Sequence, residues 1–215
     1  MDGTDIKERL LDVSERLFAE NGIKETSVRD ITSAANAHLA AVNYHFGSKE
    51  ELIRAVIARR AVPLNQQRLQ LLDAYEAEAG DAPVPLERIL HAFFAPSIAL
   101  CLQHPDVMRL AARMLFQADK DVRRVFLSQF LDTFLRFKSA LMRHALPGLP
   151  ERELFWRMHF LIGAMIHTWA NHSDLEWVSG GLCTLENQQD MMERLITFCA
   201  GGLRAPISTR LGVTV

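Results

Sequence analysis

The sequence predicts an all-α protein, in which an N-terminal three-helix unit with a helix-turn-helix precedes a larger helical domain. Apolar residues recur with the 3.6-residue period of an α-helix, and no run shows the alternation typical of a β-strand. The composition also changes along the chain. Only two of the 12 Phe residues, Phe18 and Phe46, precede residue 90, and apart from Met1 every Met lies at residue 108 or later. We therefore expect a small N-terminal unit packed by aliphatic residues and a bulkier C-terminal interior.

Two consecutive helices are predicted at the N-terminus. The first carries four apolar residues on one face, at i, i+4, i+7 and i+11: Ile6, Leu10, Val13 and Leu17. It is expected to close at Asn21-Gly22, because both residues tolerate the left-handed conformation of a helix C-terminus. The second helix begins at Ser27, whose hydroxyl can cap it while Asp30 completes a capping box three residues later.

A tight turn and a third helix follow. Asn36 occupies a turn position that requires positive φ, and the third helix is expected from about His38 to Phe46. Gly47 ends it. Residues 48–51, Ser-Lys-Glu-Glu, form a further capping box that opens the next helix.

The sequence predicts a domain boundary after residue 48. Residues 1–48 form the helix-turn-helix domain, and residues 49–215 form a second domain that opens with a connecting helix over 49–79. Pro63 is expected to kink or restart that helix, and residues 80–85 read as a linker. Further helices are predicted at about 86–103, 105–118, 121–145, 151–172 and 186–204.

Composition excludes several classes of protein. The 215 residues are 49% hydrophobic and 23% charged, with a net charge of −2, so nucleic-acid binding would depend on a local patch. The three cysteines, Cys101, Cys183 and Cys199, have no CxxC spacing, which argues against a disulfide framework or a zinc ribbon. The acidic N-terminus lacks the features of a signal peptide, and no window reaches about 18 uncharged apolar residues. We expect a cytoplasmic protein with reduced thiols.

Residues 27–45 have the arrangement of a DNA-reading helix-turn-helix. The side chains near the start of its second helix are those that can reach the floor of the major groove: His38, Leu39, Ala40, Ala41 and Asn43. Donors suited to phosphate surround them: Thr26, Ser27, Tyr44, His45 and Lys49. Residues 1–60 carry 9 basic and 10 acidic residues, so charge does not compel DNA binding, and a structural corner in a helical bundle is the alternative.

Residues 6–57 resemble the DNA-binding domain of the tetracycline-repressor (TetR) family. The resemblance rests on Ala-Glu-Asn-Gly at 19–22, Thr-Ser-Val-Arg-Asp-Ile at 26–31 and Val-Asn-Tyr-His-Phe-Gly-Ser-Lys-Glu-Glu-Leu at 42–52. It implies a homodimeric transcription factor, usually a repressor, whose C-terminal domain dimerises and binds a small molecule. It also implies base contacts from residues 39–43 and phosphate contacts from the five donors named above. The chain departs from the family pattern at Asn36, where Gly is usual, and at His38, where Ser or Thr is usual.

The C-terminal part suggests an apolar ligand site. Phe126, Phe130, Phe134 and Phe137 fall on one helix face, which is either plain core or the wall of a ligand tunnel. Residues 154–169 and 198–206 resemble those of family members that respond to fatty acids or acyl-CoA. The expected ligand-binding residues are Phe93, Met114, Phe130, Phe134, Arg113 and His159.

The helices at 151–172 and 186–204 are apolar nearly all round, so each must be covered on two faces. Pairing with their symmetry mates would make a four-helix dimer interface, and burial within one protomer is the alternative. The expected interface residues are Phe155, Ile162, Trp169, Met191, Leu195 and Phe198.

Catalysis has little support in the sequence, which has no HExxH motif, no activated cysteine and no Gly-rich phosphate loop. We therefore expect no enzyme, no cofactor and no metal. The expected partners are near-palindromic double-stranded DNA, a small apolar effector such as a fatty acid or acyl-CoA, and a second copy of the chain, with no membrane. The alternative function is a helical lipid-binding or partner-binding module whose helix-turn-helix is only structural.

Overall fold

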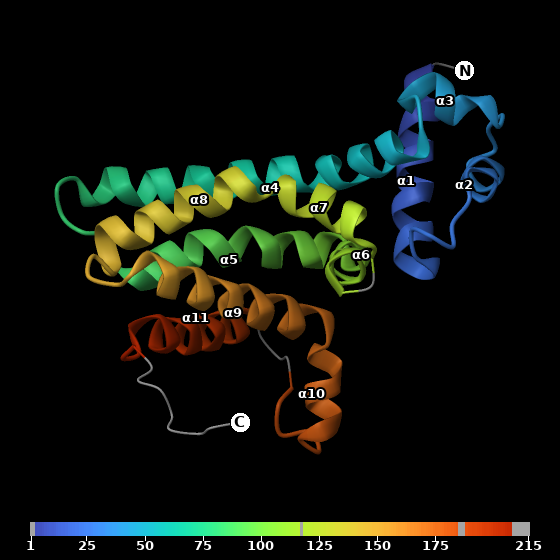
Figure 1. The fold of residues 1–215 in the computed structure, drawn as a ribbon. Helices are drawn as coiled ribbons and strands as arrows, with labels where there is room; N and C mark the ends of the chain where they lie inside the picture. The colour runs from blue at the N-terminus through green and yellow to red at the C-terminus, as the bar shows by residue number, and fades with distance from the viewer. Residues whose placement is uncertain (1–2, 117, 185–187, 208–215) are drawn as a thin grey trace, which may run out of the picture. The chain divides into compact units, whose positions relative to one another are not determined.

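The computed structural model describes residues 3–116, 118–184 and 188–207, and every element assigned within these ranges is helical. The all-α prediction is confirmed. The helices appear in chain order in Figure 1: α1 (Gly3–Asn21), α2 (Val28–Ala34), α3 (Ala40–Phe46), α4 (Lys49–Ala79), α5 (Leu86–Gln103), α6 (Pro105–Phe116), α7 (Lys120–Ser128), α8 (Leu131–Ala140), a π-helical turn η1 (Leu141–Ala145), α9 (Glu151–Ala170), α10 (His172–Val178) and α11 (Gln188–Arg204).

The chain folds as two compact units. Unit 1 comprises Met1–Gln67 and Pro96–Phe134, and unit 2 comprises Arg68–Ala95 and Leu135–Val215. Unit 1 therefore extends well beyond the helix-turn-helix domain expected from the sequence, because α6 and α7 belong to it. Among the described helices, none has both the length and the apolar composition that crossing a membrane requires.

The core of unit 1 joins the helix-turn-helix to α4 and α6. Phe18, Ile31 and Val42 bring one fully buried side chain from each of α1, α2 and α3. Leu52 adds another from α4, and Met114 from α6 packs into the same cluster. Such close packing sets the position of α3, because a core of this density resists displacement of any one helix.

The cap geometry confirms three predicted helix ends in unit 1, at Ser27, Gly47 and Ser48. Ser27 accepts a hydrogen bond from the backbone N–H of Asp30, and the Asp30 carboxylate accepts one from the backbone of Ser27 at 2.8 Å. Ser48 Oγ likewise accepts from the backbone N–H of Glu51 at 3.1 Å. Gly47 has φ of +85°, which a residue with a Cβ adopts only under strain, and so it ends α3.

One expectation for the longer helices is wrong, because the single helix expected at 121–145 is divided into α7, α8 and η1. Of the two outcomes expected at Pro63, a restart does not occur, since α4 runs as one helix through that residue. The break between α7 and α8 is closed by i→i+3 bonds, from Gln129 N to Phe126 O and from Phe130 N to Leu127 O. The segment contains neither Pro nor Gly, so its sequence carries no signal for the break.

Unit 2 is packed around aromatic side chains. The Phe93 ring meets the Phe94 and Phe137 rings at centroid distances of 5.8 and 5.1 Å, and Phe94 meets Trp169 edge-on at 6.3 Å. In this unit α9 packs against α11. Buried Arg157 strengthens the pair, because its guanidinium donates to the carbonyls of Leu203 and Ala205, both at 2.7 Å, at the C-terminal end of α11.

Candidate nucleic-acid interface

The helix-turn-helix consists of α2, α3 and the turn between them. Asn36 holds φ of +49° in this turn, as predicted. α3 begins at Ala40, two residues later than expected, and its N-cap residue Leu39 makes no side-chain capping bond. The backbone carbonyl of His38 accepts a hydrogen bond from Ala41 N at 2.8 Å, so a turn that starts at His38 leads into α3.

One face of α3 is exposed and the other is buried. Val42 faces the core with no exposed surface. The predicted base-reading residues lie elsewhere on the segment: His38, Leu39, Ala40 and Asn43 are exposed, and Ala41 is half-buried. The structure therefore leaves the predicted reading face accessible to a partner.

The predicted phosphate contacts divide into accessible and internal groups. Ser27 and Tyr44 are exposed, Tyr44 by 84%, and His45 and Lys49 are half-buried. Thr26 is only 1% exposed, and its hydroxyl donates to the carbonyl of Gly22 at 2.7 Å. This placement argues against a phosphate contact from the Thr26 side chain, because the hydroxyl already serves the loop that joins α1 to α2.

Side chains from distant parts of unit 1 hold the C-terminal end of α1. Lys49 Nζ donates to Ile23 O at 2.8 Å, and the Arg113 guanidinium donates to Glu20 O at 3.0 Å. Because the last carbonyls of a helix have no partner within it, Arg113 both satisfies Glu20 O and complements the helix dipole, while Lys49 holds the loop just after α1. The sequence analysis assigned Arg113 to the ligand, and no local signal in the sequence predicts its contact with α1.

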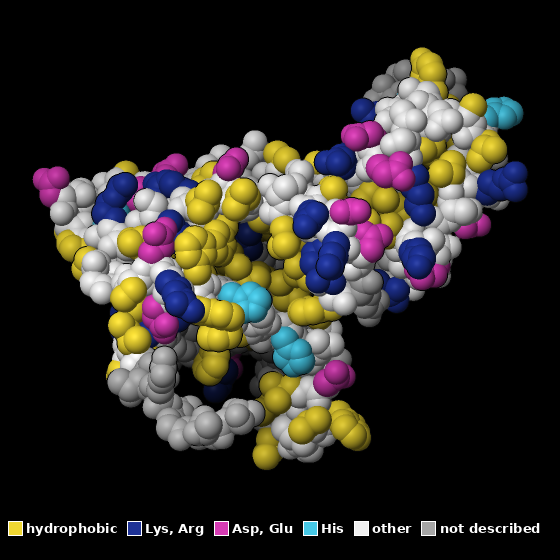
Figure 2. Space-filling model, in the orientation of Figure 1, with side chains coloured by type: hydrophobic (Ala, Val, Ile, Leu, Met, Phe, Trp, Pro, Cys, Tyr) yellow, Lys and Arg dark blue, Asp and Glu magenta, His cyan; other side chains and the backbone are white. Residues whose placement is uncertain are grey.

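Charged side chains of both signs are interleaved on the surface (Figure 2). In unit 1, Arg59 pairs with Asp12 at 2.6 Å, and Arg60 pairs with Glu15 at 2.8 Å. At the start of α2, hydrogen bonds from Ser27 hold the pKa of the Asp30 carboxyl below its usual value, with a smaller contribution from the charge of Lys49. With Arg59 and Arg60 paired to carboxylates, these two cations add little to any basic field on unit 1.

Comparison with known proteins identifies the family. The model for "Bacterial regulatory proteins, tetR family" matches residues 10–56, and the model for "Tetracyclin repressor-like, C-terminal domain" matches residues 91–202, more than half of the chain. The chain belongs to the TetR family. The first match covers α2, α3 and the turn between them, so the exposed reading face lies within it.

Curated transcriptional repressors match parts of this chain. The HTH-type transcriptional repressor KstR2 of Mycolicibacterium smegmatis is 30% identical over 102 residues, 47% of this chain and 46% of that protein. The HTH-type nicotine-responsive transcriptional repressor HdnoR of Paenarthrobacter nicotinovorans is 30% identical over 95 residues, 44% and 47% of the two chains. The chain thus spans about half the length of these curated relatives.

A solved structure shares the fold over nearly the whole chain. The structure of the fatty acid degradation regulator FadR from Bacillus halodurans has a TM-score of 0.64 and 14% identity. The match covers 94% of this chain and 97% of that one. Similarity at this level of identity shows a common architecture.

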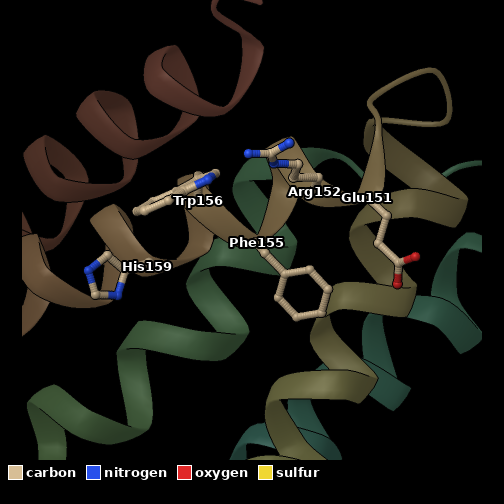
Figure 3. Close-up of a pocket in the computed structure, with 5 residues that line it drawn as sticks. All are labelled: Glu151, Arg152, Phe155, Trp156 and His159. Carbon is tan, nitrogen blue, oxygen red and sulfur yellow. The ribbon is translucent and has the colours of Figure 1, made fainter.

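The residues predicted to line one ligand site are divided between the units. Met114 and Phe130 pack in or against the core of unit 1, and Phe134 also belongs to that unit. Phe93 lies in the aromatic core of unit 2. Among the six predicted residues, His159 alone lines an open pocket of about 680 Å³ on α9, together with Glu151, Arg152, Phe155 and Trp156 (Figure 3). Sequence reasoning missed this pocket because its residues lie on what was expected to be a dimer-facing helix.

The residues predicted for the dimer interface differ in how far their side chains are exposed. Phe155 and Phe198 are exposed, the latter by 71%, and Ile162 and Met191 are half-buried. Trp169 and Leu195 are buried within unit 2, so they are corrected to core residues of one protomer. Two exposed aromatic residues of α9, missed by the sequence analysis, stack with their ring centroids 5.9 Å apart: Trp156 and Phe160.

Proposed function

We propose that this TetR-family protein is a dimeric, sequence-specific DNA-binding repressor that a small apolar effector releases from DNA. The observation that carries the proposal is the two-sided α3, which buries Val42 and exposes Leu39, Ala40 and Asn43. The major groove is about 12 Å wide and admits one α-helix. In the groove, Leu39 and Ala40 suit thymine methyl groups, and the Asn43 amide suits an adenine edge.

Dimerisation supplies the second reading helix. A single helix-turn-helix buries too little DNA surface for operator affinity, so two copies of α3 must lie about 34–36 Å apart, or a multiple of this, over a near-palindrome. Exposed aromatic side chains support a dimer interface formed by α9 and α11: Trp156, Phe160 and Phe198. Gly201 and Gly202 of α11 have open space where a Cβ would stand, so they permit close approach.

The effector is a fatty acid or an acyl-CoA in this proposal. The aromatic interior of unit 2 suits an acyl chain, and Arg68 is a cation within that interior. Its guanidinium lies 4.2 Å from the centroid of the Phe93 ring, and burial lowers its pKa to about 9. Burying the charged guanidinium costs free energy, and an anionic head group beside Arg68 would offset part of that cost by stabilising the charged form. Replacing Arg68 with Met, which removes the charge, should weaken binding of an acyl anion more than binding of a neutral ester of equal length.

The test is selection from random duplex DNA, followed by measured binding to the enriched sequence. We expect a near-palindromic site whose binding falls when an effector is added. The panel contains fatty acids, acyl-CoAs and nicotine, because one relative is named for its response to nicotine. Coupling is reciprocal, so operator DNA should weaken effector binding by the same factor. Failure to enrich any sequence would instead support the helical lipid-binding or partner-binding module.

A further inference from the structure

An apolar segment follows α9 in unit 2. We call residues 172–184, which comprise α10 and the residues after it, the arm. Its described hydrophobic side chains are exposed, with Trp177 at 83% and Leu182 at 89%. Figure 2 shows hydrophobic side chains gathered at this end of the unit. Covering an indole in an apolar site is favourable by roughly 25 cal/mol per Å² of buried area, so the arm is suited to docking.

The pocket at the other end of α9 complements the arm. Phe155 and Trp156 supply aromatic surface, and both are about half exposed (Figure 3). The Glu151 carboxylate pairs with the ammonium of Lys138. Arg152 therefore supplies the charge of the rim, which is basic and aromatic, and the His159 ring lies beside it.

The arm has the opposite charge. Asp174 and Glu176 are exposed on α10, on either side of Leu175 and next to Trp177. An acidic, apolar helix thus matches a basic, aromatic pocket in both charge and surface chemistry. Complementary charges of this kind select a partner and its orientation more than they add affinity.

The pocket is out of reach of the arm of the same chain. Trp156 and Asn171 are 15 residues apart along α9 and its C-cap, which is about 22 Å at 1.5 Å per residue. α10 has 7 residues and leaves the axis of α9 at Asn171 (Figure 1). Its length of about 10 Å does not span the return distance.

A two-fold axis brings the two features together. In an isologous dimer two copies of α9 pack antiparallel, so residues at equal distances on either side of the axis face each other. Gly163 lies near the middle of α9, and a Cβ there would meet open space, so this position allows the closest approach of the two helices. With the axis at Gly163, position 156 faces position 170 of the other copy, where that copy's α9 ends and its arm follows. The partner's arm then begins beside the pocket.

We propose that each protomer docks Trp177 of its arm in the α9 pocket of the other protomer, with Glu176 beside Arg152. This inference rests on the proposed dimer and names the contact that specifies the pairing. The exchanged arms cover apolar surface on both copies, and two reciprocal contacts form in each dimer.

The experiment mixes two charge-reversed full-length chains, Arg152→Glu and Glu176→Lys. Each homodimer contains two repulsive arm-to-pocket contacts, whereas the heterodimer contains two attractive ones. Native mass spectrometry, with one chain isotopically labelled, measures the heterodimer fraction after exchange. A tenfold change in the exchange equilibrium raises that fraction from about one half to about three quarters, and we expect at least this rise.

A matched control removes the effect of net charge. Arg124→Glu and Asp121→Lys carry the same charge changes on exposed positions of α7, and their mixture should stay at about one half heterodimer. An equal fraction in the test and control mixtures, with the unmodified chain dimeric, would overturn the arm exchange and leave the proposed regulator intact. An unmodified chain that is monomeric at all concentrations would overturn both the arm exchange and the proposed dimer.

Discussion

Asn43 and Tyr44 are neighbours on the exposed side of α3, yet we expect them to act differently. Asn43→Ala should relax discrimination at one base pair, by about 1–3 kcal/mol, because a bidentate amide reads one adenine. Tyr44→Phe should instead weaken binding to all sequences, since a phosphate contact carries no sequence information. Binding to a set of single-base operator variants distinguishes the two. An unchanged base preference in Asn43→Ala would remove it from the reading face.

Lys49 is predicted to contact a phosphate of DNA, and in the structure its ammonium also donates a hydrogen bond to Ile23 O. Lys49→Met should lower affinity for all sequences and reduce the salt slope of binding by about one, because one phosphate contact releases its counterions. It should also lower the free energy of unfolding, because the bond to Ile23 O is lost. Thr26→Val is the control, since it removes an internal bond to Gly22 O at a cost of about 1 kcal/mol. Equal salt slopes in the two variants would assign Lys49 a structural role only.

At the scale of the elements, Glu76 ties α4 to α8 and to η1. Its carboxylate accepts hydrogen bonds from Arg136 and, at 3.2 Å, from His144. The bond from Arg136 is the main reason that the pKa of Glu76 lies below its usual value. A carboxyl with a depressed folded-state pKa stabilises the fold above its unfolded-state pKa, and that stability is lost as the pH falls through the folded-state pKa.

Glu76→Gln should therefore lower the free energy of unfolding at pH 7, and this difference from the unmodified chain should shrink below about pH 4.5, the usual pKa of a glutamate. Denaturant unfolding at a series of pH values measures the difference. Glu78→Gln is a matched control on the same helix, because Glu78 pairs with Arg88 on the surface. A difference that stays constant down to pH 3 would contradict the assignment.

At the scale of the whole molecule, assembly should control DNA binding. Phe198→Glu places a charge on the proposed interface without entering the core, because Phe198 is exposed. We expect monomers in sedimentation, retained helix content, and loss of specific DNA binding, since two reading helices are needed. Leu195→Glu, which buries a charge within one protomer, should unfold unit 2 instead. An intact dimer in Phe198→Glu would refute this interface.

Features that depend on a few neighbouring residues could be predicted from the sequence. The Ser27 and Ser48 caps, the positive φ of Asn36, and the end of α3 at Gly47 are set by local hydrogen bonds and by backbone sterics. The 3.6-residue period is also a relation between neighbouring residues of one helix, and it predicted the all-α fold class. These signals also predicted the helix-turn-helix, and its exposed residues on and before α3 remain a predicted DNA-reading face.

Only the tertiary structure decided which apolar or polar side chains are inside. The helical pattern predicts both Trp169 and Phe198 as interface residues. In the structure, however, Trp169 packs on Phe94 and Phe198 remains exposed. Thr26 lies at a predicted phosphate position, but the end of α1 encloses its hydroxyl. The sequence determined most of the helices, the Ser27 and Ser48 caps and the place of α3, because the partners of those groups lie within a few residues. The core depends on contacts between distant residues, which no local pattern encodes.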